Sequence, residues 1–372
     1  MPISYRRRYL KIKRRSSKKP LVVIKHSRIK TEKSLGYYPT INADLVSFEK
    51  SVENLQPIVC CNRTQAFNFK SPIEYKINGR CLPFYEDEAV EYLLYRLKTN
   101  RYIKDINAIV VPKQIESNCW FNSMFVMFFI SDFGRVFFHY FRQFMIQGKT
   151  VTGERVDRDL WETFSLLNYI IEACVSGSKS AASLNTNKII IRIYDLIGRQ
   201  NKNPQIYQYK SAGNPIDYYI ALINYLQHNE LVSYKLNVNY FANWKETLSA
   251  AITPLSKMPH IIILEYMPHI ITLPKPGNVE KPLKFTIQNC EYTLDSCAII
   301  DKNQEHFCSA IVCNGREFIF DGYSKRRLIP FEWKSRINKN DDWQFKDYPK
   351  DIPAATWNFT SGYSCFMYYR TR

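Results

Sequence analysis

The chain has 372 residues, of which 45% are hydrophobic and 15% aromatic, so it can bury a sizeable core and is too apolar to be disordered over most of its length. Lys and Arg outnumber Asp and Glu by 52 to 34, which gives a formal net charge of +18. The longest apolar run, residues 124–130, is far shorter than the ~20 residues that span a bilayer, and no secretory signal is expected after the basic start of the chain.

The first 35 residues are strongly basic. They contain 13 Lys and Arg residues against one acid, Glu32, so this segment carries +12 of the total charge. We expect a disordered arm that either contacts nucleic acid or another polyanion, or acts as a solubilising tail. The basic residues expected to make a polyanion contact are Arg6, Arg7, Arg8, Arg14, Arg15, Lys18 and Lys19.

Residues 36–104 form an N-terminal extension or a small accessory domain, and the sequence leaves both alternatives open. They contain one predicted helix, "YEDEAVEYLLYRLKTN", which begins at Tyr85. Its acidic residues come first and its basic residues last, which is the order that the helix dipole favours.

The main domain is predicted to span residues 105–372, with helices first and strands afterwards. The predicted helices cover residues 119–145, 157–175, 187–197 and 215–228. The predicted strands are "HIIILEY", "HIITL", "LKFTI", "SCAII", "FCSAIVC", "EFIFDG" and "SGYSCFMYY". This order predicts an α+β fold with a helical lobe, an antiparallel β lobe and a cleft between them.

The ten cysteines form neither a disulfide framework nor a zinc-binding pattern. Cys60 and Cys61 are adjacent, no C-x-x-C motif occurs, and several of the others lie in apolar, strand-like runs. We therefore expect no disulfides and no metal or other cofactor. A reducing intracellular compartment, the cytoplasm or nucleus, or a virion assembled there, is the expected location.

Cys119 directly follows the polar segment "QIESN" and lies just before the apolar run at residues 124–130. At the start of a helix, the backbone N–H groups and the helix dipole would favour its thiolate. Gln114, five residues upstream, is placed to donate an amide N–H to a developing oxyanion. An inert core cysteine would show the same local pattern, so these residues alone leave both readings open.

A nucleophilic thiol needs a base, and His306 is the best candidate among the histidines. It opens the predicted strand "FCSAIVC", and Asp321 ends the next predicted strand fifteen residues later. A hairpin would bring the two side chains together at one edge of a sheet, where a carboxylate can orient a catalytic imidazole. The order Cys, His, Asp along the chain is that of papain-like enzymes.

Five blocks of this sequence resemble those of the ubiquitin-specific proteases, a branch of the papain-like cysteine proteases. "SNCWFNS" (117–123) resembles the family's cysteine box, and "NPIDYYIALINYL" (214–226) its acidic-aromatic helix. "MPHIIILEY" (258–266) is similar to a strand of the family's palm, residues 292–324 resemble its histidine box, and "SGYSCFMYYR" (361–370) resembles its closing strand. The blocks occur in the family's order.

The resemblance implies a helical thumb, a palm of β-strands and a catalytic triad of Cys119, His306 and Asp321. It places Gln114 where the family usually has an oxyanion-hole Asn. The implied activity is that of a thiol-dependent deubiquitinating isopeptidase or peptidase that acts on ubiquitin or ubiquitin-like conjugates. Asp217, Asn214 and Trp120 are the implied substrate-binding residues, with Trp120 packed beneath the cleft.

The sequence also departs from the family's pattern. Glu305 replaces the Gly before the catalytic His, and Gly322 replaces a second Asp. Only residues 227–257 separate the acidic-aromatic helix from the palm strand, where the family normally has zinc-binding fingers that hold ubiquitin. The departures bear on ubiquitin binding more than on hydrolysis.

Two other interpretations remain open. The chain is either a papain-like protease of a large DNA virus that acts on non-ubiquitin, structural proteins, or a non-catalytic polyanion-binding virion or scaffold protein that keeps the fold. The missing fingers and the basic arm favour an enzyme packaged with nucleic acid. The presence of Cys119, His306 and Asp321 argues against the non-catalytic interpretation.

Overall fold

The computed structural model describes residues 21–23, 58–61, 71–99, 103, 105–150, 153–178, 181, 185–199, 204–225, 233–238, 243–255, 258–267, 280–303, 305–324, 328–346 and 348–371. The chain divides into two compact units. Unit 1 comprises Met1–Ser27, Asn229–Val312 and Glu317–Arg372, and unit 2 comprises Arg28–His228 and Cys313–Arg316. The predicted strand "HIITL" and the seven basic residues of the predicted arm lie outside the described residues.

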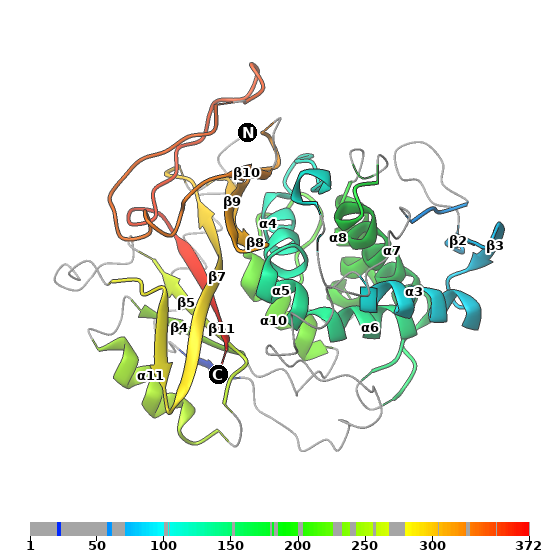
Figure 1. The fold of residues 1–372 in the computed structure, drawn as a ribbon, viewed down its shortest axis with the longest axis horizontal. Coiled ribbons are helices and arrows are strands. Elements are labelled where there is room, and N and C mark those ends of the chain that lie inside the picture. Colours follow the sequence, from blue (N-terminus) through cyan, green and yellow to red (C-terminus); the bar gives the residue numbers. More distant parts are fainter. Residues whose placement is uncertain are drawn as a thin grey trace. The chain divides into compact units, whose positions relative to one another are not determined.

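Unit 2 is mainly helical (Figure 1). A hairpin of β2 (Glu74–Ile77) and β3 (Arg80–Pro83) precedes α3 (Asp87–Thr99), which is the helix predicted from Tyr85. The later helices are η2 (Ile106–Ala108), α4 (Cys119–Phe129), α5 (Asp132–Phe137), α6 (His139–Gln147), α7 (Arg158–Val175), α8 (Asn187–Ile193), the π-helical η4 (Tyr194–Gly198) and α10 (Pro215–Tyr225).

The predicted single helix over residues 119–145 is wrong, because this segment forms the three helices α4, α5 and α6. Ser131 ends the first of them: its Oγ donates to the Met127 carbonyl at 2.6 Å and accepts from the Gly134 N–H at 3.2 Å, which caps α5. A Cβ on Gly134 would lie 2.2 Å from the Met127 carbonyl oxygen, so the chain can turn this tightly only at a glycine.

The described part of the predicted N-terminal extension packs within unit 2. The Tyr75 hydroxyl lies 2.7 Å from Ser165 Oγ of α7. Arg96 of α3 donates through Nε to Glu172 Oε2 of α7 at 3.0 Å, and Arg142 of α6 donates to the other oxygen of Glu172. All five side chains are buried, so the described residues of this segment share the core of the helices.

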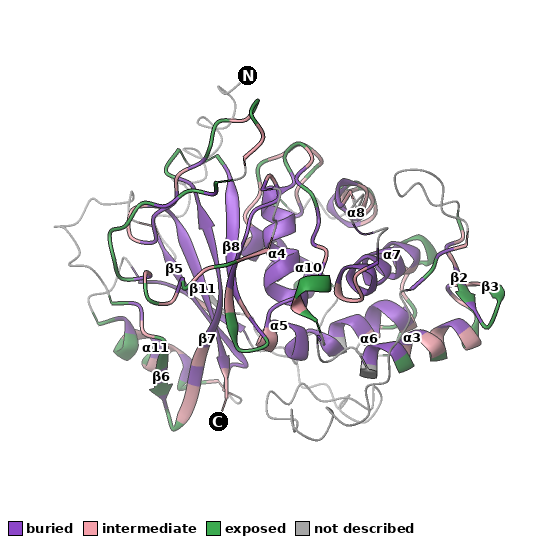
Figure 2. Ribbon diagram, turned by 45° about the horizontal axis from the view of Figure 1, so that its top comes forward, coloured by how far each residue is buried: buried purple, intermediate pink, exposed green. Residues whose placement is uncertain are grey.

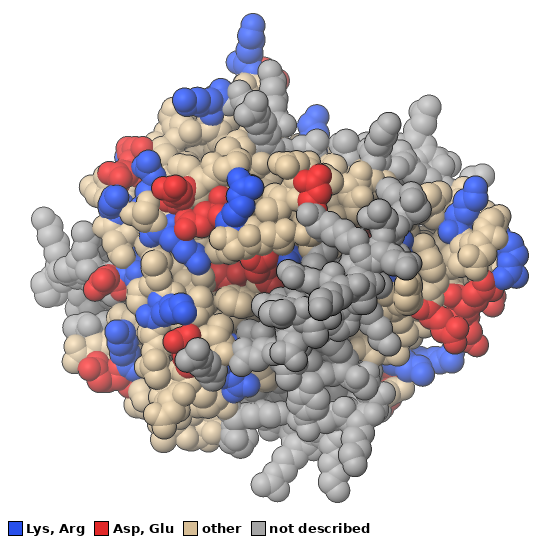
Figure 3. Space-filling view, in the orientation of Figure 1, with Lys and Arg blue, Asp and Glu red and all other residues tan. Residues whose placement is uncertain are grey.

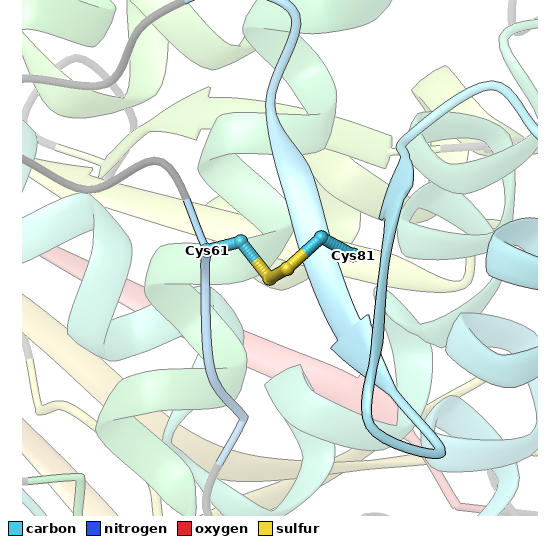
Figure 4. Close-up of a disulfide and its surroundings, with 2 residues drawn as sticks. All are labelled: Cys61 and Cys81. Carbon is cyan, nitrogen blue, oxygen red and sulfur yellow. A yellow bond between two sulfur atoms is a disulfide. The ribbon is translucent and has the colours of Figure 1, made fainter.

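A disulfide joins Cys61 to Cys81 of β3 (Figure 4), so the prediction that the cysteines form no disulfides is wrong. Their Cα atoms are 5.9 Å apart although the residues are 20 positions apart in sequence. Cys60 pairs with Tyr75 of β2, which brings the neighbouring Cys61 to the hairpin. Cysteine usage therefore no longer argues for a reducing compartment.

Unit 1 contains a mixed nine-stranded sheet in the order β1-β4-β5-β11-β7-β8-β9-β10, with β6 paired to β7. The strands are β1 (Leu21–Val23), β4 (Ser233–Asn237), β5 (Ile261–Tyr266), β6 (Lys284–Ile287), β7 (Cys290–Ile300), β8 (Phe307–Cys313), β9 (Arg316–Phe320), β10 (Leu328–Pro330) and β11 (Ser364–Arg370). Strand β1 is the only described part of the predicted disordered arm. Helices and a mixed sheet together confirm the α+β class.

The sheet is not wholly antiparallel as predicted. Strand β11 pairs antiparallel with β5 and with β7, but β4 pairs in parallel with β5. Parallel neighbours need a long crossover connection, and helix α11 (Trp244–Ile252) lies in the connection between β4 and β5. The prediction of an antiparallel lobe is therefore wrong at this pair.

A large apolar cluster of unit 1 lies on one face of the sheet. Leu264, Phe366 and Cys297 are cross-strand neighbours on β5, β11 and β7, and all three are fully buried. Leu248 of α11 and Trp357, from the long connection between β10 and β11, belong to the same apolar cluster. Figure 2 shows this continuous burial along the central strands. The ends of these strands are thereby held in fixed positions.

The described surface carries charges of both signs. On the face drawn in Figure 3, Lys and Arg side chains are interspersed with Asp and Glu side chains. Among the helices that the structure describes, none has the length and apolar character required to cross a membrane.

Candidate active site

His306 and Asp321 are in direct contact within unit 1. His306 lies just before β8 and Asp321 just after β9. Their side chains meet with Nε2 of His306 2.7 Å from Oδ1 of Asp321. His306 is 9% exposed and Asp321 is fully buried. An ionised carboxylate only accepts hydrogen bonds, so Nε2 carries the shared proton and the orientation of the ring is fixed.

The turn before His306 is organised by Asp301, which is 2% exposed. Asp301 Oδ1 accepts from the backbone N–H groups of Glu305 at 2.7 Å and His306 at 2.9 Å. The Asp301 N–H donates in turn to the His306 carbonyl at 2.9 Å. Asp301 was not among the predicted site residues, although an Asp at the start of a polar turn is the usual signal for such bonds.

Asp321 is bound from more than one side. Besides His306, its Oδ1 accepts from the Tyr323 N–H at 3.0 Å, and its Oδ2 accepts from the hydroxyl of Tyr348. Burial raises the pKa of Tyr348, and the negative charge of Asp321 raises it further. The Tyr323 and Trp357 rings lie 4.9 Å and 5.9 Å from the His306 ring, so the imidazole is enclosed by aromatic side chains.

Cys119 is the first residue of α4 in unit 2 and is 9% exposed. Every residue of this helix is buried. The preceding residue, Asn118, uses its side chain to fix the loop: Oδ1 accepts from the Ile115 N–H, and Nδ2 donates to Thr186 Oγ1, both at 3.0 Å. The thiol therefore lies at the N-terminus of a buried helix whose preceding loop is held by hydrogen bonds.

The loop before Cys119 is also bound to α8 and to α4. Asn122 Nδ2 donates to the Lys113 carbonyl at 3.2 Å, while Asn122 Oδ1 accepts from the Thr186 hydroxyl at 2.7 Å. Asn187 Nδ2 donates to the Ile115 carbonyl at 3.0 Å. Thr186 and Asn187 were not predicted as site residues, because residues so distant from Cys119 along the chain carry no local signal of this contact.

Gln114 belongs to this fixed loop and is 5% exposed. Its Nε2 donates to the Glu116 carbonyl, and its Oε1 is buried without a hydrogen-bond partner in the described part of the chain. Glu116 has a φ of 55°, an uncommon conformation for a residue with a side chain, and its carboxylate accepts from the Tyr209 hydroxyl. A primary amide has two N–H donors, of which the Glu116 carbonyl engages one.

The three residues implied in substrate binding, Asn214, Asp217 and Trp120, all lie in unit 2. Asn214 Oδ1 accepts from the N–H groups of Ile216 at 2.9 Å and Asp217 at 3.1 Å, so Asn214 caps α10. Asp217 is partly buried in the first turn of that helix. Trp120 is 2% exposed and packs 4.8 Å from the Tyr218 ring, so it lies beneath the surface.

The structure brings His306 and Asp321 together in unit 1, whereas Gln114 and Cys119 share a loop and helix start in unit 2. Within the described ranges, no group of three or more His, Cys, Asp and Glu side chains is arranged to hold a metal ion. A carboxylate-bound imidazole can act as a general base, and a thiol at a helix N-terminus can act as a nucleophile.

The sequence matches no protein-family model and no curated protein. The solved structures that are distantly similar to the chain include the following two. One is from the SAGA DUB module of Ubp8, Sgf11, Sus1 and Sgf73 bound to monoubiquitin, with 10% identity, a TM-score of 0.43, and coverage of 92% of this chain and 95% of that chain. The other is an essential yeast splicing factor, with 11% identity, a TM-score of 0.42, and coverage of 81% and 84%.

Proposed function

We propose that the chain is a thiol-dependent peptidase or isopeptidase, with a papain-like catalytic domain over residues 105–372. The observation that carries the proposal is the buried hydrogen bond between His306 Nε2 and Asp321 Oδ1 at 2.7 Å. A histidine oriented by a carboxylate is the general base of the Cys-His-acid and Ser-His-Asp hydrolases. Cys119, at the start of α4, supplies the nucleophile.

In the proposed reaction, the Cys119 thiolate attacks the carbonyl carbon of the scissile amide. The side-chain amide of Gln114 and the backbone N–H of Cys119 donate to the oxyanion that forms. Protonated His306 gives its proton to the leaving amine as the C–N bond breaks, which leaves a thioester. His306 then takes a proton from the attacking water, and cleavage of the C–S bond releases the acid and regenerates the thiolate. Because Asp321 binds Nε2, Nδ1 is the nitrogen that exchanges these protons.

The favoured substrates are conjugates of ubiquitin or a ubiquitin-like protein. The support is the order of the five sequence blocks between residues 117 and 370, which resemble those of the ubiquitin-specific proteases. Asp217, in the first turn of α10, is the carboxylate proposed to pair with basic residues of a ubiquitin-like tail. The Asn214 cap would orient the first turn that carries it.

A second candidate is a peptidase that acts on other proteins. The observation that favours it concerns the connection between α10 and β5, where fingers would be expected. Its described residues form β4, which joins the main sheet, and α11, which packs on the core. Such a connection stabilises the fold of unit 1 and would not bind the globular part of ubiquitin.

A ubiquitin probe with a C-terminal propargylamide tests the proposal. The wild type is expected to form a covalent adduct, Cys119→Ala none, and His306→Ala an adduct roughly 10²–10⁴-fold more slowly. Cys290→Ala is the matched control, because Cys290 is a free and partly exposed cysteine of unit 1. An adduct that persists in Cys119→Ala would overturn the proposal.

A small alkylating reagent separates the two candidates. If Cys119 reacts faster than Cys290 at neutral pH but forms no adduct with the ubiquitin probe, the second candidate is favoured. A buried thiol without activation should react more slowly than the more exposed Cys290. If Cys119 reacts more slowly than Cys290 in the folded wild type, Cys119 is not an activated nucleophile, and both candidate functions are refuted.

A further inference from the structure

We propose that Tyr348 is a positioning residue for the His306–Asp321 pair. The inference rests on the proposed function and adds to it a residue that the sequence motifs did not single out. The carboxylate of Asp321 is held at both oxygens: Oδ1 faces His306 Nε2 at 2.7 Å, and Oδ2 accepts from the Tyr348 hydroxyl. A carboxylate bound at both oxygens cannot rotate about χ2 without breaking one of these bonds, so Tyr348 fixes the oxygen that orients the imidazole.

Tyr348 is itself held by a fixed framework. It lies in the connection between β10 and β11, whose residues Trp343 and Trp357 exchange backbone hydrogen bonds of 3.0 Å and stack at 5.1 Å. The Tyr348 ring packs 6.4 Å from Trp357 and 6.1 Å from Tyr323. The same Trp357 ring lies 5.9 Å from the His306 ring. The hydroxyl is thus aimed at Asp321 by packing that it shares with the imidazole.

The charges around the Tyr348 hydroxyl favour its protonated form, which can donate a hydrogen bond. The groups that face it are Asp321, Asp301 and Cys308, with His306 on the far side of the Asp321 carboxylate. Burial and the two carboxylates raise the pKa of Tyr348, so its proton remains in place across the pH range of any peptidase assay. A hydrogen bond to an ionised carboxylate stabilises its charge and resists its protonation.

Loss of this donor therefore has a predictable effect on the pair. Without the hydroxyl, Asp321 Oδ2 loses a donor and its Oδ1 is no longer held toward His306. The pH dependence of the probe reaction should then differ from that of the wild type, because the carboxylate no longer orients the imidazole in the same way. The rate of reaction at neutral pH should fall about tenfold, the effect expected of one hydrogen bond to a charged group.

The experiment compares Tyr348→Phe with Tyr292→Phe. Both changes remove one tyrosine hydroxyl from unit 1 and keep the ring, but the Tyr292 hydroxyl donates to the Pro259 carbonyl at 2.8 Å, away from Asp321. The readouts are the pH dependence of the covalent probe reaction and a ¹⁵N NMR titration of His306. We expect both to shift in Tyr348→Phe and to match the wild type in Tyr292→Phe. Thermal melting checks that each variant is folded.

A double-mutant cycle tests whether Tyr348 acts on His306 through Asp321. In an Asp321→Asn background, Tyr348→Phe should change the His306 titration little, because the charge through which Tyr348 acts is gone. An equal effect in both backgrounds, or a His306 titration identical in Tyr348→Phe and Tyr292→Phe, would overturn the inference. The NMR titration needs no turnover, so it still reports on Tyr348 if Cys119 shows no peptidase activity and the proposed function fails.

Discussion

Replacement of Glu172 by Gln is expected to lower the free energy of unfolding of unit 2 by about 3–5 kcal/mol, the range for removal of one partner from a buried ion pair. The side chain of Glu172 is 1% exposed, and those of its partners Arg96 and Arg142 are 1% and 3% exposed. Gln preserves the shape but removes the negative charge that faces two buried guanidinium groups. The three residues come from α7, α3 and α6, so the loss acts on the packing of three helices at once.

Urea unfolding followed by circular dichroism of the helices measures this effect. The matched control is Glu88→Gln, which removes the partner of Arg80 from a pair whose side chains are 42% and 65% exposed. An exposed pair contributes roughly 0–1 kcal/mol, so the control should unfold almost as the wild type does. If Glu172→Gln and Glu88→Gln shift the midpoint equally, the reasoning from burial is refuted.

Three further predictions concern other parts of the chain. Burial lowers the pKa of Lys281 from 10.5 to about 8, so Lys281→Met should stabilise unit 1 by roughly 3 kcal/mol at pH 7. Between pH 8 and 10.5 the unfolded chain holds the proton that the folded chain has lost, so wild-type stability rises with pH and the advantage of Met shrinks. Asp301→Ala should slow the probe reaction about tenfold by releasing the turn that presents His306. Cys61→Ser should lower the stability of unit 2 by about 3 kcal/mol, because the disulfide closes a 20-residue separation.

Each of these predictions has a direct check. Denaturant melts at pH 7 and pH 10 compare Lys281→Met with the wild type, and an equal difference at both pH values contradicts the titration argument. Near-UV circular dichroism shows whether Asp301→Ala is folded. Full probe reactivity in a folded variant would contradict the prediction that the turn presents His306 for the reaction. A reductant should lower the melting temperature of the wild type but not of Cys61→Ser; an unchanged wild-type melting temperature contradicts the disulfide prediction.

Local patterns predicted the elements that carry their own signals. Helix α7 begins at Arg158 after the Asp157 cap, whose carboxylate accepts from the Asp159 N–H at 2.8 Å, and a cap followed by periodic apolar residues is visible in a sequence. Strand β8 is likewise a short apolar run after a polar turn. In both elements the interactions that set the boundary come from residues close by in the chain.

Features that depend on distant partners were missed. Strand β4 has the sequence "SYKLN", which is too polar to mark a buried strand, and it is a strand because it pairs with β5 beyond helix α11. The contact between Cys61 and Cys81 depends on the pairing of Cys60 with Tyr75, which no spacing reveals. Propensity and periodicity describe neighbours along the chain, whereas these contacts arise from tertiary pairing.

The candidate site likewise contains residues that local patterns predicted and a residue that they did not. The positions of His306 and Asp321 at successive strand ends predicted an imidazole beside a carboxylate, and the two side chains lie in contact. The roles of Cys119 and Gln114 in catalysis stay predictions. Tyr348 was missed because it reaches Asp321 from an irregular connection 27 residues further on, where no periodic pattern marks an inward-facing side chain.

The central place of β11 in the sheet has a consequence for synthesis of the protein. Strand β11, Ser364–Arg370, lies between β5 and β7, so these earlier strands cannot be joined until the ribosome has released residue 370. Almost all of unit 2 has been translated by residue 228. Unit 2 can thus fold on the nascent chain while the edges of β5 and β7 that will pair with β11 are still unpaired. Slow translation or a shortened β11 should prolong the exposure of these edges to chaperones and to aggregation.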